Sequence, residues 1–390
     1  MPGFELIGEE EQRALQDIFS SSSGVLFAHG FDKQRNGIFR VRNFESDLSV
    51  RLAAKHCQAV TSGTAAQVVA LKAMGVKPGD EVITQAFTFV ATVEAILAVG
   101  AVPIVVDVDE TLNMAPGAFA EAISEKTSCV VPVHMLGNPA EMDDICAIAN
   151  ENNLLIGEDA CESLGASYKG VLTGTIGDTG FFSLDFGKTI TSGEGGFILT
   201  NDPEIYFKMR SFHDHGHDYL EGIPRGLDTA TDIGFNYRMT EMQAAVGIEQ
   251  LKKLDYILSR NRSHKAFLKS GLADRDLAIS FRRITDPQGE LADTLMFFLE
   301  HEQTAAAVVK NLAEEGLGTK NVPDAMNWHF AANWGHIWKD TAYADCYQTQ
   351  WSKSATILNR CVSLPIMVNW TEQDLHRILE GITNAIIRAT

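Results

Sequence analysis

Hydrophobic and polar positions change their period repeatedly between residues 56 and 200. Short runs rich in Val and Ile alternate with stretches in which apolar residues recur every three or four positions. The short runs predict strands at residues 59–61, 81–84, 103–107, 129–133, 154–157, 180–184 and 197–200. The longer stretches predict helices at residues 65–74, 89–99, 116–124 and 142–153. This alternation indicates βαβ units and a mostly parallel sheet between two helical layers, an α/β/α arrangement.

A second pattern begins near residue 240. Residues 240–268 contain few helix breakers and predict one long helix, or two, leaving the first domain. Residues 293–300 then predict a strand, and residues 303–315 and 372–387 predict helices. We therefore expect a large domain of residues 1–250 and a smaller α+β domain of residues 251–390.

Composition narrows the class of protein. The formal net charge of −19 argues against binding of nucleic acid or anionic lipid, because such binders carry clustered Lys and Arg. The six cysteines contain no CxxC pair, which favours a reducing cytoplasm over a disulfide framework or a zinc site. Residues 1–20 lack the apolar core of a signal peptide, and the longest apolar run, residues 95–106, is too short for a membrane span. We expect a cytoplasmic protein without a membrane anchor.

A first candidate for chemistry is Ser62-Gly63-Thr64-Ala65, where a predicted strand passes through glycine into a helix. The first N–H groups of a helix lack internal partners and its dipole favours an anion, so this junction can hold a phosphate. A plain helix cap at Ser62 or Thr64 explains the same residues.

A second candidate is Asp159, which ends the apolar run that begins at Leu154. An open parallel sheet binds ligands at the carboxyl ends of its strands. An aspartate there can keep a pyridine nitrogen protonated, which lets a pyridoxal ring withdraw electrons. A turn-capping aspartate is the competing interpretation.

A third candidate is Lys188, which a strand delivers to the polar, glycine-rich loop that precedes Gly195 and Gly196. A lysine amine attacks an aldehyde only when deprotonated, and we expect nearby positive charge to lower its pKa. The same amine can then carry protons between carbon centres. The two glycines allow a close backbone approach, a positive φ, or both.

Two familiar motifs overlap this loop but lack their required context. Gly187-Lys188-Thr189 ends like a Walker A loop, yet Phe182 stands where that motif needs a glycine. The Asp-Phe-Gly of residues 185–187 has no accompanying HRD triplet. No GxGxxG follows a predicted strand, so nicotinamide chemistry has no support either.

Taken together, these segments resemble the DegT/DnrJ/EryC1 family of sugar aminotransferases, pyridoxal-phosphate (PLP) enzymes with the type I aspartate aminotransferase fold. The resemblance covers nearly the whole chain. The segments that carry it are residues 62–66, 88–92, 158–160, 182–183 with Lys188, 193–196 and 234–240.

The resemblance implies a role for each matching residue. Thr64, Ala65 and Ser183 would hold the cofactor phosphate, and Phe89 would stack on the pyridine ring. Asp159 would pair with the ring nitrogen, and Lys188 would be the Schiff-base residue. The family is usually homodimeric, with Asn236 reaching the partner's phosphate. A weaker match implies that His329 approaches the substrate.

One position departs from the family pattern. Glu162 stands where the family usually has Gln or His near the phenolic oxygen of the cofactor. A hydrogen bond to that oxygen would need a protonated carboxyl or another donor.

The loop after Lys188 is more similar to those of inosose and 3-deoxy-octulosonate aminotransferases than to those of nucleotide-sugar enzymes. It favours transfer from glutamate or glutamine to 8-keto-3-deoxy-octulosonate, a lipopolysaccharide precursor. A nucleotide-linked keto-hexose or scyllo-inosose is the alternative acceptor. A PLP-dependent sugar dehydratase is disfavoured because there a histidine replaces the lysine, and a PLP-binding regulatory protein without turnover is a further rival.

Two histidine-rich stretches remain. Residues 213–218 contain imidazole and carboxylate groups, which are good ligands for a metal ion. The side chains of alternating loop residues need not converge on one ion, however, and the family resemblance implies no metal, so we expect none. A loop in which His215 or His217 faces substrate, or a plain surface loop, fits better. Residues 328–338, with three tryptophans, would either line a sugar pocket or pack between domains.

Overall fold

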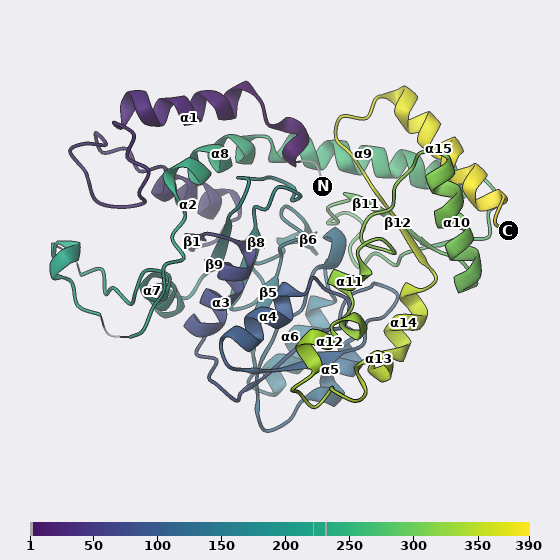
Figure 1. Cartoon of the computed structure of the whole chain (residues 1–390), viewed down its shortest axis with the longest axis horizontal. Helices are drawn as coiled ribbons and strands as arrows, with labels where there is room; N and C mark the ends of the chain where they lie inside the picture. The colour runs from purple at the N-terminus through teal and green to yellow at the C-terminus, as the bar shows by residue number, and fades with distance from the viewer. Residues whose placement is uncertain (1–2, 221, 231) are drawn as a thin grey trace.

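A seven-stranded sheet forms the centre of the computed structural model, which describes residues 3–220, 222–230 and 232–390 (Figure 1). Its strands, in spatial order, are β1 (His56–Val60), β9 (Gly196–Thr200), β8 (Thr179–Ser183), β5 (Leu155–Asp159), β4 (Thr127–Val130), β2 (Glu81–Gln85) and β3 (Val102–Val106). Strand β9 runs antiparallel to both of its neighbours, whereas the pairs from β8 to β3 are parallel. The mostly parallel sheet is confirmed.

Helices cover both faces of this sheet, because successive strand residues point to opposite sides. Phe181 packs with the helices of one face, α3 (Gly63–Ala73), α4 (Ala91–Ala98) and α7 (Pro203–Phe212). Phe182, the next residue, packs on the other side with α2 (Arg40–Arg51) and α8 (Glu241–Lys252). Helices α5 (Pro116–Ala122) and α6 (Met142–Glu151) extend that second layer. The α/β/α arrangement is therefore confirmed.

The long helical stretch predicted at residues 240–268 consists of two helices, α8 and α9 (Leu254–Ala273). Helix α8 begins with a capping box, in which Thr240 and Gln243 each bond the other's backbone N–H. Figure 1 shows α9 continuing from α8 across the top of the molecule into the C-terminal part. Leu268 and Leu272 of α9 pack in the C-terminal core.

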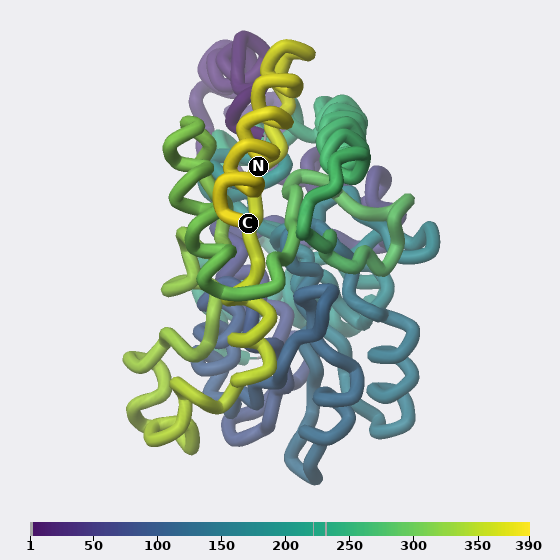
Figure 2. Tube along the Cα trace, turned by 90° about the vertical axis from the view of Figure 1, so that its right-hand side faces the viewer, coloured from purple at the N-terminus to yellow at the C-terminus, as the bar shows by residue number. Residues whose placement is uncertain are grey.

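The C-terminal part is built on an antiparallel sheet of β10 (Ser280–Phe281), β11 (Thr294–Phe298) and β12 (Cys361–Pro365). Helices α10 (Glu302–Glu314) and α15 (Glu372–Ile387) lie side by side against it (Figure 2). The strand and the helices predicted here are confirmed. Strands β10 and β12 were not predicted, because β10 has only two residues and β12 carries no clear alternation.

Residues 326–358 leave the C-terminal core and pack beside the large sheet. They contain α11 (Met326–His329), α12 (Gly335–Trp338), α13 (Tyr347–Gln350) and α14 (Ser352–Leu358). Trp334 and Trp338 are fully buried there, and Trp351 donates from Nε1 to the Val105 carbonyl at 2.8 Å. These indoles therefore fill a core, and the interpretation of this stretch as a sugar pocket is wrong for Trp334 and Trp338. The division at residue 250 stays a prediction.

The N-terminal segment adds α1 (Glu9–Ser21), which packs on α8. This helix was not predicted, although Ala14 and Ile18, and Leu15 and Phe19, recur at helical spacing. Glu11 is buried, and its carboxylate accepts a hydrogen bond from Lys253 Nζ at 2.6 Å. A short hairpin of β6 (Ser167–Tyr168) and β7 (Val171–Leu172) completes the strands described here. Within the described ranges, every helix is too short or too polar to cross a membrane.

Candidate active site

A cavity of about 360 Å³ opens where several strands of the large sheet end. Asp159 ends β5 and Ser183 ends β8, and both residues line the cavity. This is the edge at which open parallel sheets bind their ligands. The lining residues are Ser62, Gly63, Thr64, Gln67, Thr88, Phe89, Ala91, Val133, Met135, Asp159, Cys161, Glu162, Ser183, Asp185, Lys188, Glu194, Asn321 and His329.

The first turn of α3 forms one end of the cavity. Ser62 caps this helix, because its Oγ accepts the Ala65 N–H at 3.0 Å. A Cβ added to Gly63 would lie 2.8 Å from Ser183 Cβ, so glycine allows the helix start to approach β8 closely. The structure thus brings the predicted junction of Ser62, Gly63 and Thr64 together with Ser183. Ala65 is buried behind them and does not line the cavity.

Asp159 faces the cavity from the end of β5 and is only 3% exposed. Its Oδ2 accepts hydrogen bonds from Thr92 Oγ1 at 2.8 Å and Gln67 Nε2 at 3.1 Å, and its Oδ1 accepts the Cys161 N–H at 3.1 Å. A carboxylate offers about four lone-pair sites, so three donors leave room for one more. Burial raises the pKa of Asp159, against the lowering effect of the Thr92 and Cys161 hydrogen bonds.

The neighbouring Glu158 shows why only one of the two carboxylates serves this cavity. It points to the other face of the sheet, where its oxygens accept from the backbone N–H groups of Gly174, Ile176 and Gly177 at 2.6–2.8 Å. His134 Nε2 donates to it at 2.9 Å. Glu158 is therefore a structural acceptor that fastens the loop before β8.

Lys188 reaches the cavity from the loop after β8, and its Nζ lies 3.4 Å from Glu162 Oε1. Burial lowers the pKa of Lys188, but the negative charges of Glu162, Asp185 and Asp159 outweigh that effect, so the pKa is raised. The expectation that nearby positive charge lowers this pKa is wrong for the cofactor-free chain. The charges around the amine come from acidic residues of neighbouring loops and strands.

Glu162 is the carboxylate partner of Lys188. Burial raises its pKa, but the positive charges of Lys188 and Lys320 oppose that effect and the net shift is downward. Its Oε2 also accepts the Leu136 N–H at 3.2 Å. Glu162 is thus ionised in this cavity, and the suggestion of a protonated carboxyl at this position is not supported. A donor to the phenolic oxygen of the cofactor must come from another group.

Phe89 and His329 form one wall because their segments pair as strands do. The Thr88 N–H donates to the His329 carbonyl at 3.0 Å, and the Val90 N–H donates to the Trp328 carbonyl at 2.8 Å. The two rings lie 5.3 Å apart, and Phe89 is 43% exposed, which leaves its ring free to stack on a flat ligand. His329 Nδ1 donates to the Ala325 carbonyl, and burial lowers its pKa, so Nε2 is an unprotonated acceptor.

Besides Ala65, three predicted residues lie outside this cavity. Asn236 is exposed, and its Oδ1 accepts the Arg238 N–H at 3.4 Å. His215 is exposed, and His217 lies 3.3 Å from Asp228. The chain's own fold does not bring their side chains to Lys188, so their roles stay predictions, and that of Asn236 requires a second subunit. Among the described residues, no group of three or more His, Cys, Asp or Glu is placed to hold a metal ion.

Several residues of the site were missed from the sequence. Gln67 lines the cavity and follows Gly63 by one helical turn on α3. Thr92, which donates to Asp159 from outside the lining, lies within the 88–92 segment that carried the family resemblance. Helical spacing alone could have placed Gln67 beside Thr64. Asn321 had no signal, because it comes from the C-terminal part and meets the cavity only in the folded chain.

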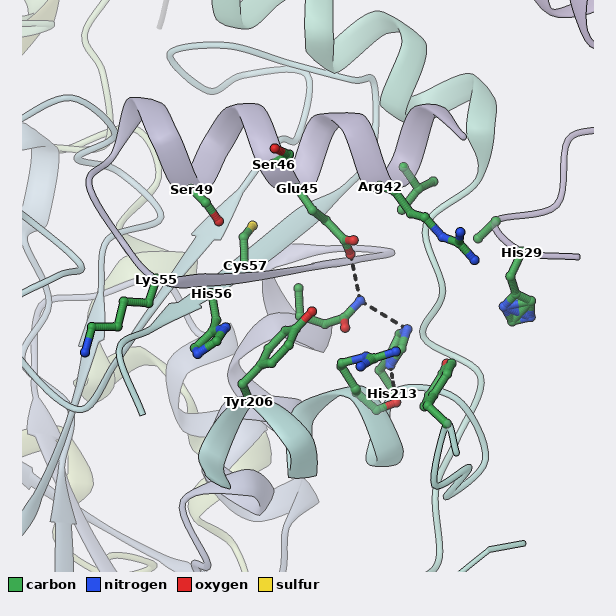
Figure 3. Close-up of a pocket in the computed structure, with 15 residues that line it drawn as sticks. His29, Arg42, Glu45, Ser46, Ser49, Lys55, His56, Cys57, Tyr206 and His213 are labelled. Atoms are coloured by element: carbon green, nitrogen blue, oxygen red, sulfur yellow. Dashed lines mark hydrogen bonds between the residues drawn. The ribbon is translucent and has the colours of Figure 1, made fainter. Parts of the chain in front are cut away.

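A second cavity, of about 420 Å³, lies between α2, β1 and α7 (Figure 3). Figure 3 shows Glu45 pointing from α2 towards His213, with the Gln58 amide bonded to both at 2.9 and 3.2 Å. Burial raises the pKa of Glu45 to about 7 and lowers that of His213 to about 4. Near pH 7 His213 is therefore neutral and Glu45 is about half ionised. Neither Lys188 nor Asp159 lines this cavity, so it is not the site of the predicted chemistry.

The cavity at Lys188 fits PLP through the chemistry of its groups. A capped helix start with two hydroxyl side chains suits a phosphate, a buried carboxylate with a free lone pair suits a pyridinium N–H, and a lysine suits an aldehyde. An exposed phenyl ring beside them suits the flat heterocycle. The fold and this site define a PLP-dependent transferase of the type I fold.

The chain belongs to the DegT/DnrJ/EryC1/StrS aminotransferase family, whose model matches residues 32–383. A GDP-perosamine synthase of Caulobacter vibrioides is 32% identical over 357 residues, which make up 88% of this chain and 89% of that protein. An aminotransferase from Psychrobacter cryohalolentis has a similar structure, with a TM-score of 0.86, 25% identity and 98% of each chain covered. The structure of NtdA from Bacillus subtilis with bound cofactor PMP has a TM-score of 0.83 and 26% identity, and the match covers 99% of this chain and 84% of that one. The chain is a PLP-dependent sugar aminotransferase.

A first prediction concerns the charge beside Lys188. We expect Glu162→Gln to lower the pKa of Lys188, because it removes the carboxylate that raises it. The neutral amine then exists at lower pH, and the rate profile for PLP uptake by cofactor-free protein should move down by about one pH unit. Stopped-flow absorbance measured from pH 6 to 10 reports this shift. Glu194→Gln, which removes a carboxylate elsewhere in the cavity lining, is the matched control, and an unmoved profile for Glu162→Gln would contradict the assignment.

Proposed function

We propose that this enzyme moves an amino group from glutamate or glutamine to the carbonyl carbon of a keto-sugar, with Lys188 bonded to the cofactor aldehyde between turnovers. The observation that carries the proposal is that Lys188, Asp159 and the start of α3 line one cavity. PLP, when bound, withdraws electrons from the carbon that exchanges its amino group.

Three residues act on protons and charge in this scheme. Asp159 accepts the N–H of the ring nitrogen and keeps it protonated, and a positive ring beside it relieves the effect of burial on its pKa. Lys188 Nζ, once released, would take a proton from the amine-bearing carbon of the donor and would give it up to the carbon on the other side of the transferred nitrogen. Glu162 Oε1, 3.4 Å away, holds the free ammonium inside the cavity between those steps.

For the acceptor we propose 8-keto-3-deoxy-octulosonate, supported by the similarity of the loop of residues 188–196. The GDP-perosamine synthase relative supports the alternative, a nucleotide-linked keto-hexose. Turnover assays with both sugars and with scyllo-inosose distinguish these acceptors. Strong activity on the nucleotide-linked sugar alone would exclude 8-keto-3-deoxy-octulosonate as the acceptor. Bleaching of the cofactor absorbance by glutamate distinguishes an enzyme from a PLP-binding regulatory protein.

We also propose a cytoplasmic homodimer in which Asn236 completes the phosphate site of the partner subunit. Two features support this arrangement: Asn236 is exposed on a loop away from the chain's own cavity, and the six cysteines are free.

Subunit mixing tests the shared site. Lys188→Ala and Asn236→Ala proteins are each expected to be nearly inactive, but a mixed dimer contains one site with both native residues. Random mixing should therefore restore about a quarter of the native activity, since half of the dimers are mixed and each has one working site. If Asn236 acts within its own chain, no activity returns. Lys169→Ala mixed with Asn236→Ala is the control for dilution.

A further inference from the structure

Asn321 is a buried polar residue that neither the cofactor nor the amino donor of the proposed mechanism uses. It is 8% exposed, and its side chain lines the cavity together with Lys188, Glu162 and His329. Within the described part of the chain, its Nδ2 has no hydrogen-bond partner. Buried amide N–H groups are almost always paired, so an unpaired one beside a ligand cavity indicates a partner supplied by the ligand.

The backbone holds Asn321 in a conformation that few residues tolerate. Its φ is 66°, in the left-handed region that only Gly, Asn and Asp adopt readily. On one side, the Lys320 N–H donates to the Ser363 carbonyl at 2.9 Å; on the other, the Ser363 N–H donates to the Val322 carbonyl at 3.2 Å. Strand β12 therefore fixes the turn on both sides of the residue.

The neighbouring Lys320 side chain strengthens this frame. Its Nζ donates to Asp293 Oδ2 at 2.8 Å and to Thr294 Oγ1 at 2.6 Å at the start of β11, and both Lys320 and Asp293 are buried. With Lys320 anchored to β11 and the backbone anchored to β12, the Asn321 amide is presented to the cavity by a rigid element. Rigid presentation of this kind gives precise hydrogen-bond geometry.

The groups around Asn321 decide which chemistry it recognises. Glu162 is ionised and accepts only, and His329 offers an unprotonated Nε2, because its Nδ1 donates to Ala325. This wall repels a carboxylate or a phosphate but suits hydroxyl groups, which donate to Glu162 or His329. A hydroxyl also pairs with an amide in either orientation, since it both donates and accepts.

We infer that Asn321, with His329 and Glu162 beside it, binds the hydroxyl groups of the keto-sugar next to its reacting carbonyl and sets specificity for a polyhydroxylated acceptor. This inference rests on the proposed transfer to a keto-sugar. It places the neutral, hydroxyl-bearing part of the acceptor against the C-terminal segment and any anionic group of the acceptor elsewhere.

The test uses Asn321→Gly and Asn321→Asp in the PLP-loaded enzyme, because both residues tolerate a φ of 66° whereas alanine would strain the turn. Asn321→Gly removes the amide, and Asn321→Asp replaces it with an acceptor. Asn153→Gly is the control, since Asn153 is exposed, lies outside the cavity and also has a positive φ of 55°. Melting temperatures verify that all variants fold.

We expect both Asn321 variants to raise KM for the keto-sugar about tenfold, the loss of one neutral hydrogen bond, with kcat less affected. An acceptor that lacks hydroxyl groups beside its carbonyl should lose little. The rate at which glutamate bleaches the cofactor absorbance should stay native.

Other outcomes separate the two proposals. An unchanged KM, or an equal slowing of the glutamate step, overturns the role of Asn321 and leaves the proposed transamination intact. A native enzyme that does not react with glutamate overturns the proposed function and the inference with it.

Discussion

Lys188→Arg is expected to abolish transamination, with turnover at least about 10⁴-fold below that of the native enzyme. Arginine keeps the positive charge that faces Glu162, so the buried carboxylate retains a partner and the fold is preserved. A guanidinium is not deprotonated in proteins, however, so it neither bonds to an aldehyde nor carries protons between carbons. The substitution thus separates the chemistry of this lysine from its ion pair.

Two measurements check this expectation. Borohydride should fix the cofactor to native protein, with the added mass on the peptide that contains Lys188, and should leave Lys188→Arg unmodified. The melting temperature should stay close to native, because the contact with Glu162 survives. Lys169→Arg, a change at an exposed lysine paired with Asp143, serves as the matched control. Borohydride fixation at another lysine would refute the assignment.

Asp159→Asn is expected to reduce kcat about 10³-fold, the effect of removing one preorganised electrostatic partner from a reacting centre. The amide is similar in shape and can still accept the Cys161 N–H, so the loop after β5 should keep its course. We expect kcat to fall because a neutral amide cannot keep the ring nitrogen of the cofactor protonated. Cofactor binding should weaken far less than turnover, because the start of α3 is unchanged.

The neighbouring residue offers a contrast for this prediction. Glu158→Gln changes the adjacent carboxylate, whose oxygens accept three backbone N–H groups on the opposite face of the sheet. We expect this variant to lose thermal stability and to keep native kcat per folded molecule. Equal losses of kcat for the two variants would show that Asp159 acts through the fold and not on the cofactor.

The acidity of the cavity explains how these residues work together. Asp159, Glu162 and Asp185 line the cavity with one lysine, and their charges outweigh the effect of burial on its pKa. In the cofactor-free chain Lys188 is therefore an ammonium, and uptake of the aldehyde should accelerate as the pH rises towards its raised pKa. The carboxylate of Glu162 keeps the amine at the cavity, although it lies where the family usually has a neutral side chain.

The sequence alone predicted the architecture well wherever the pattern was local. Alternating apolar periods predicted the strands of the parallel part of the sheet and the helices between them to within a few residues, because a buried strand or an amphipathic helix needs that spacing. The same local pattern located the first turn of α3, Asp159 and Lys188. Their chemistry depends on positions after strand ends, and the sequence shows a strand end where an apolar run gives way to polar or glycine-rich residues.

Only the tertiary structure decided the rest. The ionised state of Glu162 and the raised pKa of Lys188 depend on which charges surround them, and those charges come from distant segments. Trp334 and Trp338 proved to be core residues because residues 326–358 fold back onto the large sheet. Asn321 joins the cavity through a turn fixed by β12, a contact between remote parts of the chain. The spacing of apolar residues reflects the period of a single helix or strand. Burial, local charge and cavity shape, in contrast, arise only when elements far apart in sequence come into contact.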